Sequence, residues 1–174
     1  MIDPLITIVI ATSLAILFLL AARHKLSAPL RFKAQLSAYQ LVPDNLLSPV
    51  TRVLPWIEIV IALSMLFAVS RPFGGIAAAL LLSAYAVAMA INLRRGRSAI
   101  DCGCGDTPQP LSSWLVLRNL ILAFGALLML VPVATRSLNM LDMLFALLFV
   151  VLCSLSYTMM EHLSRNHNLL THKE

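Results

Sequence analysis

Hydrophobic residues are grouped along this chain in five long runs, separated by shorter polar segments. The runs cover about 4–22, 53–70, 73–93, 113–132 and 139–160. Each is close to the roughly 20 residues that an α-helix needs to cross the hydrocarbon of a membrane. The pattern predicts an all-α protein, a polytopic transmembrane helical bundle with four core helices plus a fifth. We expect residues 1–174 to form a single integral membrane domain.

The first run also resembles the apolar part of a secretory signal. Met1-Ile2-Asp3-Pro4 places no basic residue before it, and the run is long for a signal segment. We therefore expect this run to be retained as a membrane helix.

Composition narrows the class of protein further. Hydrophobic residues make up 60% of the chain and charged residues 12%, so the apolar surface exceeds what one small soluble core can hide. The net charge of +5 suggests nucleic-acid binding only until the basic residues are placed on the five spans. They then gather on one membrane face, so the expected partner is the lipid bilayer and no nucleic acid.

The distribution of Lys and Arg predicts an orientation. Ten of the 13 fall on the side of the 23–52 connection, the 94–112 loop and the C-terminal tail, whereas Arg71 and Arg136 fall on the other side and Arg118 lies within a predicted span. By the positive-inside rule, this asymmetry places the N-terminus outside and both the 94–112 loop and the C-terminus in the cytoplasm.

The connection between the first two runs is amphipathic. Apolar residues recur among Lys and Gln over about 26–42, which predicts a short helix lying in the membrane interface. Pro43 and Pro49 are expected to break regular structure before the second span begins near Val53.

The 94–112 loop carries the most specific chemistry, because Cys102 and Cys104 lie there with one residue between them. A disulfide between them would close a small, strained ring that is readily reduced, and two thiolates also suit a soft metal ion. Gly103 and Gly105 allow backbone angles that other residues resist. Either cysteine is a candidate nucleophile.

Two charged residues lie inside the predicted spans at matched depth. Glu58 and Arg118 are each five residues from the basic face, roughly 7–8 Å deep at about 1.5 Å per residue. Because unpaired charges in hydrocarbon are costly, we expect an ion pair between them. The alternative is that Arg118 extends to lipid phosphates.

Further polar residues gather in the same half of the membrane. Asn92, Asn119 and Cys153 lie toward the loop, which indicates one polar site capped by the two cysteines. Cys153 is a candidate relay thiol, or a third metal ligand with Cys102 and Cys104. The alternative is an inert, small apolar side chain.

Several short motifs together resemble the methylamine utilisation protein MauE family, within the wider DoxX-like membrane proteins. They are Arg23-x-Lys25, Phe32, Tyr39-x-x-x-Pro43, Pro55-x-x-Glu58, Asn92-x-x-Arg95-Gly96, Cys102-x-Cys104-Gly105 and Arg118-Asn119. The resemblance covers most of the chain, and the cysteine loop with its flanking Asn, Arg and Gly is its specific part.

The resemblance implies a multi-pass protein of the bacterial inner membrane that works with a thioredoxin-fold partner. Its expected activity is thiol–disulfide exchange in the maturation of exported proteins, of which the methylamine dehydrogenase small subunit is the family's namesake client. Cys102 and Cys104 would be catalytic, with Glu58, Arg118, Asn92, Asn119, Arg95, Gly103 and Gly105 supporting them. A redox-active Cys102–Cys104 disulfide is expected and no separate cofactor, and the chain carries no quinone signature.

Two other hypotheses fit the cysteine pair. A protein that binds or transports a soft metal would use Cys102 and Cys104 as ligands, with Cys153 as a third. A non-catalytic anchor for a redox partner would need neither thiol.

Overall fold

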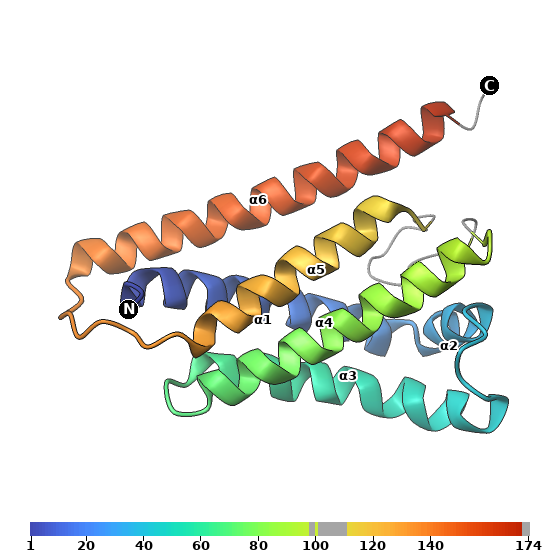
Figure 1. Ribbon diagram of the computed structural model, residues 1–174, viewed down its shortest axis with the longest axis horizontal. Helices are drawn as coiled ribbons and strands as arrows, with labels where there is room; N and C mark the ends of the chain where they lie inside the picture. The colour runs from blue at the N-terminus through green and yellow to red at the C-terminus, as the bar shows by residue number, and fades with distance from the viewer. Residues whose placement is uncertain (98–99, 101–110, 172–174) are drawn as a thin grey trace.

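The computed structural model describes residues 1–97, 100 and 111–171, and the side chains of 160–162 and 164–171 are outside the description. The described chain is built of helices (Figure 1). They are α1 (Pro4–Ser27), α2 (Pro29–Ala38), α3 (Asp44–Leu66), α4 (Arg71–Arg94), α5 (Ser113–Leu127), the 3₁₀ turn η1 (Leu128–Leu130) and α6 (Met140–Thr171). Five of these elements, with α5 and η1 taken together, are long and apolar enough to cross a membrane.

The long helices alternate in direction, so the bundle has two distinct ends. We call the end where α4 leads through residues 101–110 into α5 the loop end, and the opposite one the far end. The short α2 lies at the loop end, whereas the N-terminus and the link from α5 to α6 lie at the far end (Figure 1). A parallel bridge between Ile2 and Val133 joins the two segments there.

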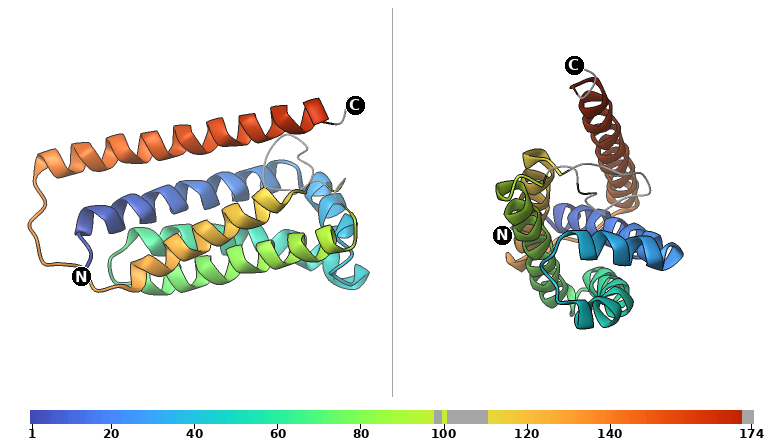
Figure 2. Two further views of the ribbon diagram at one scale, coloured as in Figure 1. Left: turned by 45° about the horizontal axis from the view of Figure 1, so that its top comes forward. Right: turned by 90° about the vertical axis from the view of Figure 1, so that its right-hand side faces the viewer.

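Four helices enclose the main core, and α6 lies outside them. The principal contacts join α1 with α3, α3 with α4, and α4 with α5, while α6 packs mainly on α1. Figure 2 shows α6 beside the group rather than within it. Ala146 and Val150 are its buried apolar contacts. The prediction of an all-α membrane bundle of four core helices plus a fifth is confirmed, and the short helix α2 lies within the segment that was expected to be amphipathic.

Helix packing at the far end depends on two adjacent glycines of α4. A Cβ atom on Gly75 would lie 2.8 Å from the backbone oxygen of Ala126 in α5, and one on Gly74 would lie 2.9 Å from Cγ of Met65 in α3. Side chains at these positions would hold the backbones apart, so the glycines allow α4 to approach both neighbours.

The second span differs from the sequence expectation of 53–70. Pro49 does not break the chain, because α3 begins at Asp44 and contains both Pro49 and Pro55. The Thr51 hydroxyl donates to the carbonyls of Leu47 and Ser48, 2.9 and 3.0 Å away, in the turn where Pro49 supplies no N–H. Packing of α3 against neighbouring helices allows the helix to contain both prolines.

The end of α3 at Leu66 also has a local cause. Ser70 Oγ donates to the carbonyl of Ser64 at 2.8 Å, and Arg71 Nε donates to the carbonyl of Met65 at 3.1 Å. These side chains satisfy carbonyls that the last helical turn leaves open. The chain therefore reverses directly into α4.

Candidate functional site: a buried charged cluster at the loop end

The structure pairs Glu58 of α3 with Lys25 of α1. Lys25 Nζ forms a salt bridge with Glu58 Oε1, and the Tyr85 hydroxyl of α4 donates to the same oxygen at 2.7 Å. Glu58 is 0% exposed and Lys25 is 7% exposed. Three helices therefore bring an ammonium, a carboxylate and a phenol together inside the bundle.

Aromatic rings enclose the Lys25 ammonium. Its Nζ atom lies 5.1 Å from the ring centre of Tyr85 and 5.4 Å from that of Phe32, the buried residue of α2. Both distances are within the range of a cation–π interaction. Phe32 thus attaches the short helix α2 to the charged cluster.

Such a cluster is costly to bury. Desolvation of two charges offsets much of their attraction, so a buried ion pair adds little net stability, yet removing one partner is strongly destabilising. The second carboxylate oxygen, Glu58 Oε2, is buried and has no hydrogen-bond partner within the described residues. Ionisable groups at such depth are a common mark of function in membrane proteins.

The predicted pair between Glu58 and Arg118 is wrong. The Arg118 guanidinium carbon lies 5.3 Å from the ring centre of Tyr157, so Arg118 stacks on α6, whereas Lys25 is the cation beside Glu58. Matched depth alone could not identify the partner of Glu58, because α1 and α5 each carry a basic residue toward the loop end.

Lys25 was not selected as a site residue from the sequence because the first span was expected to end at residue 22. In the structure α1 continues to Ser27. One signal was available: Lys25 continues the buried stripe that runs through Leu14, Phe18 and Ala22 at helical spacing. Tyr85 was also missed, since a tyrosine in an apolar helix gives no comparable signal.

Asn92, Arg95 and Gly96 form the C-terminal cap of α4. Gly96 has a φ of +73°, its N–H donates to the carbonyl of Leu93, and the N–H of Arg97 donates to that of Asn92, both at 3.0 Å. This pattern is a Schellman motif, which requires a residue in the left-handed region at the glycine position. It turns the chain toward residue 100, and Arg95 is exposed.

The side chain of Asn92 is fully buried. Its Nδ2 donates to the carbonyl of Ala88 at 3.1 Å, and its Oδ1 has no hydrogen-bond partner within the described residues. Asn119 is also buried and donates to the carbonyl of Leu115 at 2.8 Å. Each amide nitrogen is therefore satisfied by its own helix.

The base of the cysteine loop is packed on the bundle. The Leu111 N–H donates to the carbonyl of Ile100 at 3.1 Å. This bond joins the two chain segments that flank residues 101–110. Leu111 lies in a buried cluster with Tyr39, Met89 and Leu115. Cys102, Gly103, Cys104 and Gly105 themselves lie outside the described residues.

Cys153 is exposed on the outer helix α6, while Ser154 and Tyr157 beside it are half-buried. No group of three His, Cys, Asp or Glu side chains placed to hold a metal ion occurs within the described part of the chain. Whether Cys153 lies near Cys102 or Cys104 falls outside the described residues.

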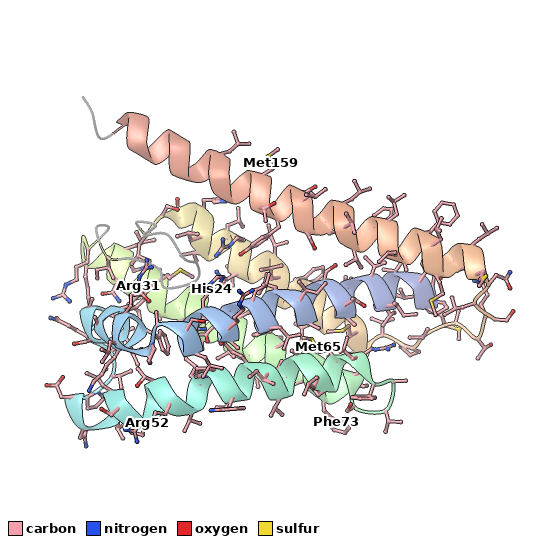
Figure 3. The ribbon with its side chains drawn as sticks, turned by 180° about the vertical axis from the view of Figure 1, so that it is seen from behind. His24, Arg31, Arg52, Met65, Phe73 and Met159 are labelled. Atoms are coloured by element: carbon pink, nitrogen blue, oxygen red, sulfur yellow. The ribbon has the colours of Figure 1, made fainter. Side chains whose placement is uncertain are left out.

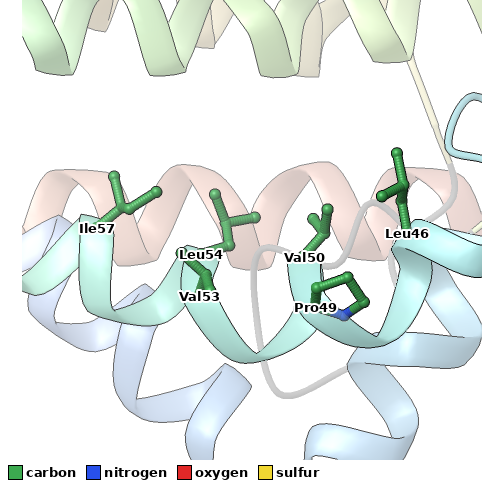
Figure 4. Close-up of a pocket in the computed structure, with 6 residues that line it drawn as sticks. All are labelled: Leu46, Pro49, Val50, Val53, Leu54 and Ile57. Carbon is green, nitrogen blue, oxygen red and sulfur yellow. The ribbon is translucent and has the colours of Figure 1, made fainter.

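An apolar groove of about 290 Å³ runs along α3 at the loop end. Its lining is formed by Leu46, Pro49, Val50, Val53, Leu54 and Ile57 (Figure 4). Because the lining offers no polar surface, the groove resembles a lipid contact more than a reaction site.

Figure 3 places two of the basic residues relative to the two ends of the bundle. Arg31 and Arg52 lie at the loop end, and Met65 and Phe73 lie toward the far end (Figure 3). Fold and site together define a multi-pass membrane protein, a helical bundle that buries a charged cluster near one end.

Comparison with known proteins gives the family. A model described as methylamine utilisation protein MauE matches residues 3–132, so the chain belongs to the MauE family. MauE of Paracoccus denitrificans is 38% identical over 129 residues, covering 73% of this chain and 69% of that protein. MauE of Methylophilus methylotrophus is 33% identical over 159 residues, covering 89% and 84%. No solved structure matches the chain.

Proposed function

We propose that this protein is a membrane thiol–disulfide exchange protein with a role in methylamine utilisation, as the names of its relatives indicate. Cys102 and Cys104 are its reactive pair, and a thioredoxin-fold protein is its partner. The exported client is of the methylamine dehydrogenase small-subunit type.

The observation that carries the proposal is the packing of the residues on either side of the cysteine loop. Both residues that flank it, Ile100 and Leu111, pack into one apolar cluster, and Tyr85 packs against that cluster while bonding to Glu58. The chain on either side of the two cysteines is therefore packed on the bundle, beside a residue of the buried charged cluster. Two thiols separated by one residue suit reversible exchange.

The exchange conserves atoms and electrons. A loop thiolate attacks one sulfur of the partner's disulfide, which gives a mixed disulfide and releases the partner's other thiol. The second loop thiol then displaces the partner, so that the loop leaves as a disulfide and the partner as a dithiol. The reverse sequence passes oxidising equivalents back to the partner and on to client thiols.

Trapping of the mixed disulfide tests the proposal. If one loop cysteine attacks the partner, the other resolves the mixed disulfide, so the variant that keeps only the attacking cysteine cannot release the partner. Either Cys102→Ser or Cys104→Ser should therefore accumulate a covalent adduct with a thioredoxin-fold protein on a non-reducing gel. Cys153→Ser is the matched control and should accumulate none. The proposal is wrong if both loop variants form no adduct and support full maturation of the client.

We further propose that the protein lies in the inner membrane with the N-terminus outside and the loop end in the cytoplasm. The support is the Lys and Arg asymmetry, with Arg31 and Arg52 at the loop end (Figure 3) and Arg136 in the link from α5 to α6 at the far end. An exported client then requires reducing or oxidising equivalents to cross the bundle. A membrane-impermeant thiol reagent should therefore label Cys102 and Cys104 only after the cells are opened, and labelling of intact cells would reverse the orientation.

A further inference from the structure

The apolar groove along α3 faces the membrane. Three of its lining residues are exposed, Leu46 by 47%, Val53 by 53% and Ile57 by 44%. They belong to a helix long and apolar enough to cross the bilayer, and Figure 4 shows Leu46, Val50 and Ile57 pointing to the same side of it. Because the lining offers no polar surface, an apolar group fills the groove without losing hydrogen bonds.

The groove has the length of a lipid tail in one leaflet. The spacing of Leu46 and Ile57 along α3 corresponds to roughly 16 Å at about 1.5 Å per residue. Half of the hydrocarbon thickness of a bilayer is about 15 Å. Leu46 lies in the first turn of α3 at the loop end, so the groove descends from that membrane interface toward the bilayer centre. An acyl chain of the leaflet at the loop end therefore matches it in length and direction.

Two cations near the outer part of α3 have no carboxylate partner within the described residues. Arg52 is exposed and follows Pro49 of the lining by three residues, so the two side chains are neighbours on the helix surface. Lys33 of α2 is exposed and donates to the neutral hydroxyl of Ser48 at 2.8 Å, at the level where the groove begins. Asp44 in the first turn of α3 opposes them with a single charge. The two cations therefore complement an anionic group beside the groove.

We propose that the groove holds one acyl chain of an anionic phospholipid whose phosphate is bound by Arg52 and Lys33. A long basic side chain on a spanning helix extends its charged head toward the interface, where lipid phosphates lie. Basic residues near the membrane surface favour anionic over zwitterionic lipids, and the groove holds the tail of the same molecule. Neither loop cysteine takes part, so this site is independent of the proposed function.

Lipid selectivity tests the headgroup contact. The full-length protein, purified in detergent, is given equal amounts of dioleoyl phosphatidylglycerol and dioleoyl phosphatidylcholine and is analysed by native mass spectrometry. We expect the anionic lipid to be bound at least fivefold more than the zwitterionic one, and Arg52→Gln to lower this ratio at least threefold. Arg136→Gln removes a 48% exposed arginine at the far end and should leave the ratio unchanged. A wild-type ratio below twofold, or equal ratios in the two variants, would overturn the inference.

A second pair of variants tests the groove itself. Val53→Trp fills the groove, whereas Val60→Trp makes the same change at a 65% exposed position of α3 outside the lining. Both positions are exposed, so the folded protein should tolerate both changes. We expect Val53→Trp to lower the binding of phosphatidylglycerol at least threefold and Val60→Trp to leave it unchanged.

Two results of that comparison would overturn the inference. Equal lipid binding by Val53→Trp and Val60→Trp would place the lipid elsewhere on the protein. A wild-type dimer that Val53→Trp alone abolishes would assign the groove to a second copy of this chain.

Discussion

The two ends of the bundle are built on different principles. At the far end, α4 contacts its neighbours through Gly74 and Gly75, and fully buried apolar side chains such as Met65 fill the space between helices. At the loop end, the interior holds Lys25 and Glu58 and two asparagines. The far end contains close helix contacts at two glycines, whereas the loop end contains the buried charges and amides.

This difference separates a structural region from a chemical one. Close apolar packing fixes the helices at the far end without any ionisable group in the described interior, although Thr7 is buried there. The loop end buries charged side chains, although apolar side chains alone could fill its core. Retention of such groups is expected where they support chemistry, and the cysteine loop lies at that end.

The largest expected effect comes from breaking the charged pair. Glu58→Ala leaves the Lys25 ammonium buried without its carboxylate, so we expect a loss of about 3–5 kcal/mol in the free energy of unfolding. Unfolding in mixed micelles by denaturant would measure it. A loss below about 1 kcal/mol would mean that the loop-end interior is hydrated and that Lys25 reaches water.

A smaller effect is expected at the far end from Gly75→Ala. The new Cβ would lie 2.8 Å from a backbone oxygen of α5, and such overpacking costs about 1–3 kcal/mol. Gly125→Ala is the matched control, because a Cβ there meets nothing within 4 Å. The same unfolding measurement should show Gly125→Ala equal to or above the wild type, since alanine favours helix. Equal stabilities of the two variants would refute close packing at Gly75.

Arg136→Gln should have a weaker effect. Arg136 bonds to Asp142 at 2.6 Å and lies 3.7 Å from Asp3, but its side chain is 48% exposed. Exposed ion pairs contribute at most about 1 kcal/mol, and salt screens them. We expect a loss below about 1 kcal/mol in the free energy of unfolding, decreasing further in high salt. A larger loss would show that the far end also depends on charge.

Cys153→Ser should have no measurable effect on exchange by the loop. Cys153 is exposed on α6, outside the four-helix core. The rate of mixed-disulfide formation in the variant should equal that of the wild type. A clear reduction in rate would restore Cys153 as a relay and bring α6 into the site.

The sequence predicted the architecture well because apolar runs of membrane length leave few alternatives. It predicted less of the site. Glu58 was chosen for its unusual depth, but its partner depends on helix packing, and Lys25 was counted with the interfacial basic residues because α1 was expected to end too early. The expectation that Pro49 breaks regular structure was wrong for a related reason. Tertiary packing and the Thr51 hydroxyl outweigh the local tendency of proline to break a helix.

Tyr85 could not be predicted as a site residue. Nothing in its sequence surroundings distinguishes it from an interfacial aromatic residue, and its place in the charged cluster depends on contacts with α1 and α3. The Asn92-x-x-Arg95-Gly96 motif, in contrast, was noted as part of a resemblance and has a local structural explanation as the cap of α4.

The central claim is that Cys102 and Cys104 interconvert between dithiol and disulfide in the living membrane. Differential alkylation of the native chain in growing cells, with the two cysteines read by mass spectrometry, measures this directly. The account predicts a mixture of both forms that shifts on brief treatment with oxidant or reductant and returns after its removal. A pair that stays fully reduced and unresponsive under all three conditions would contradict it.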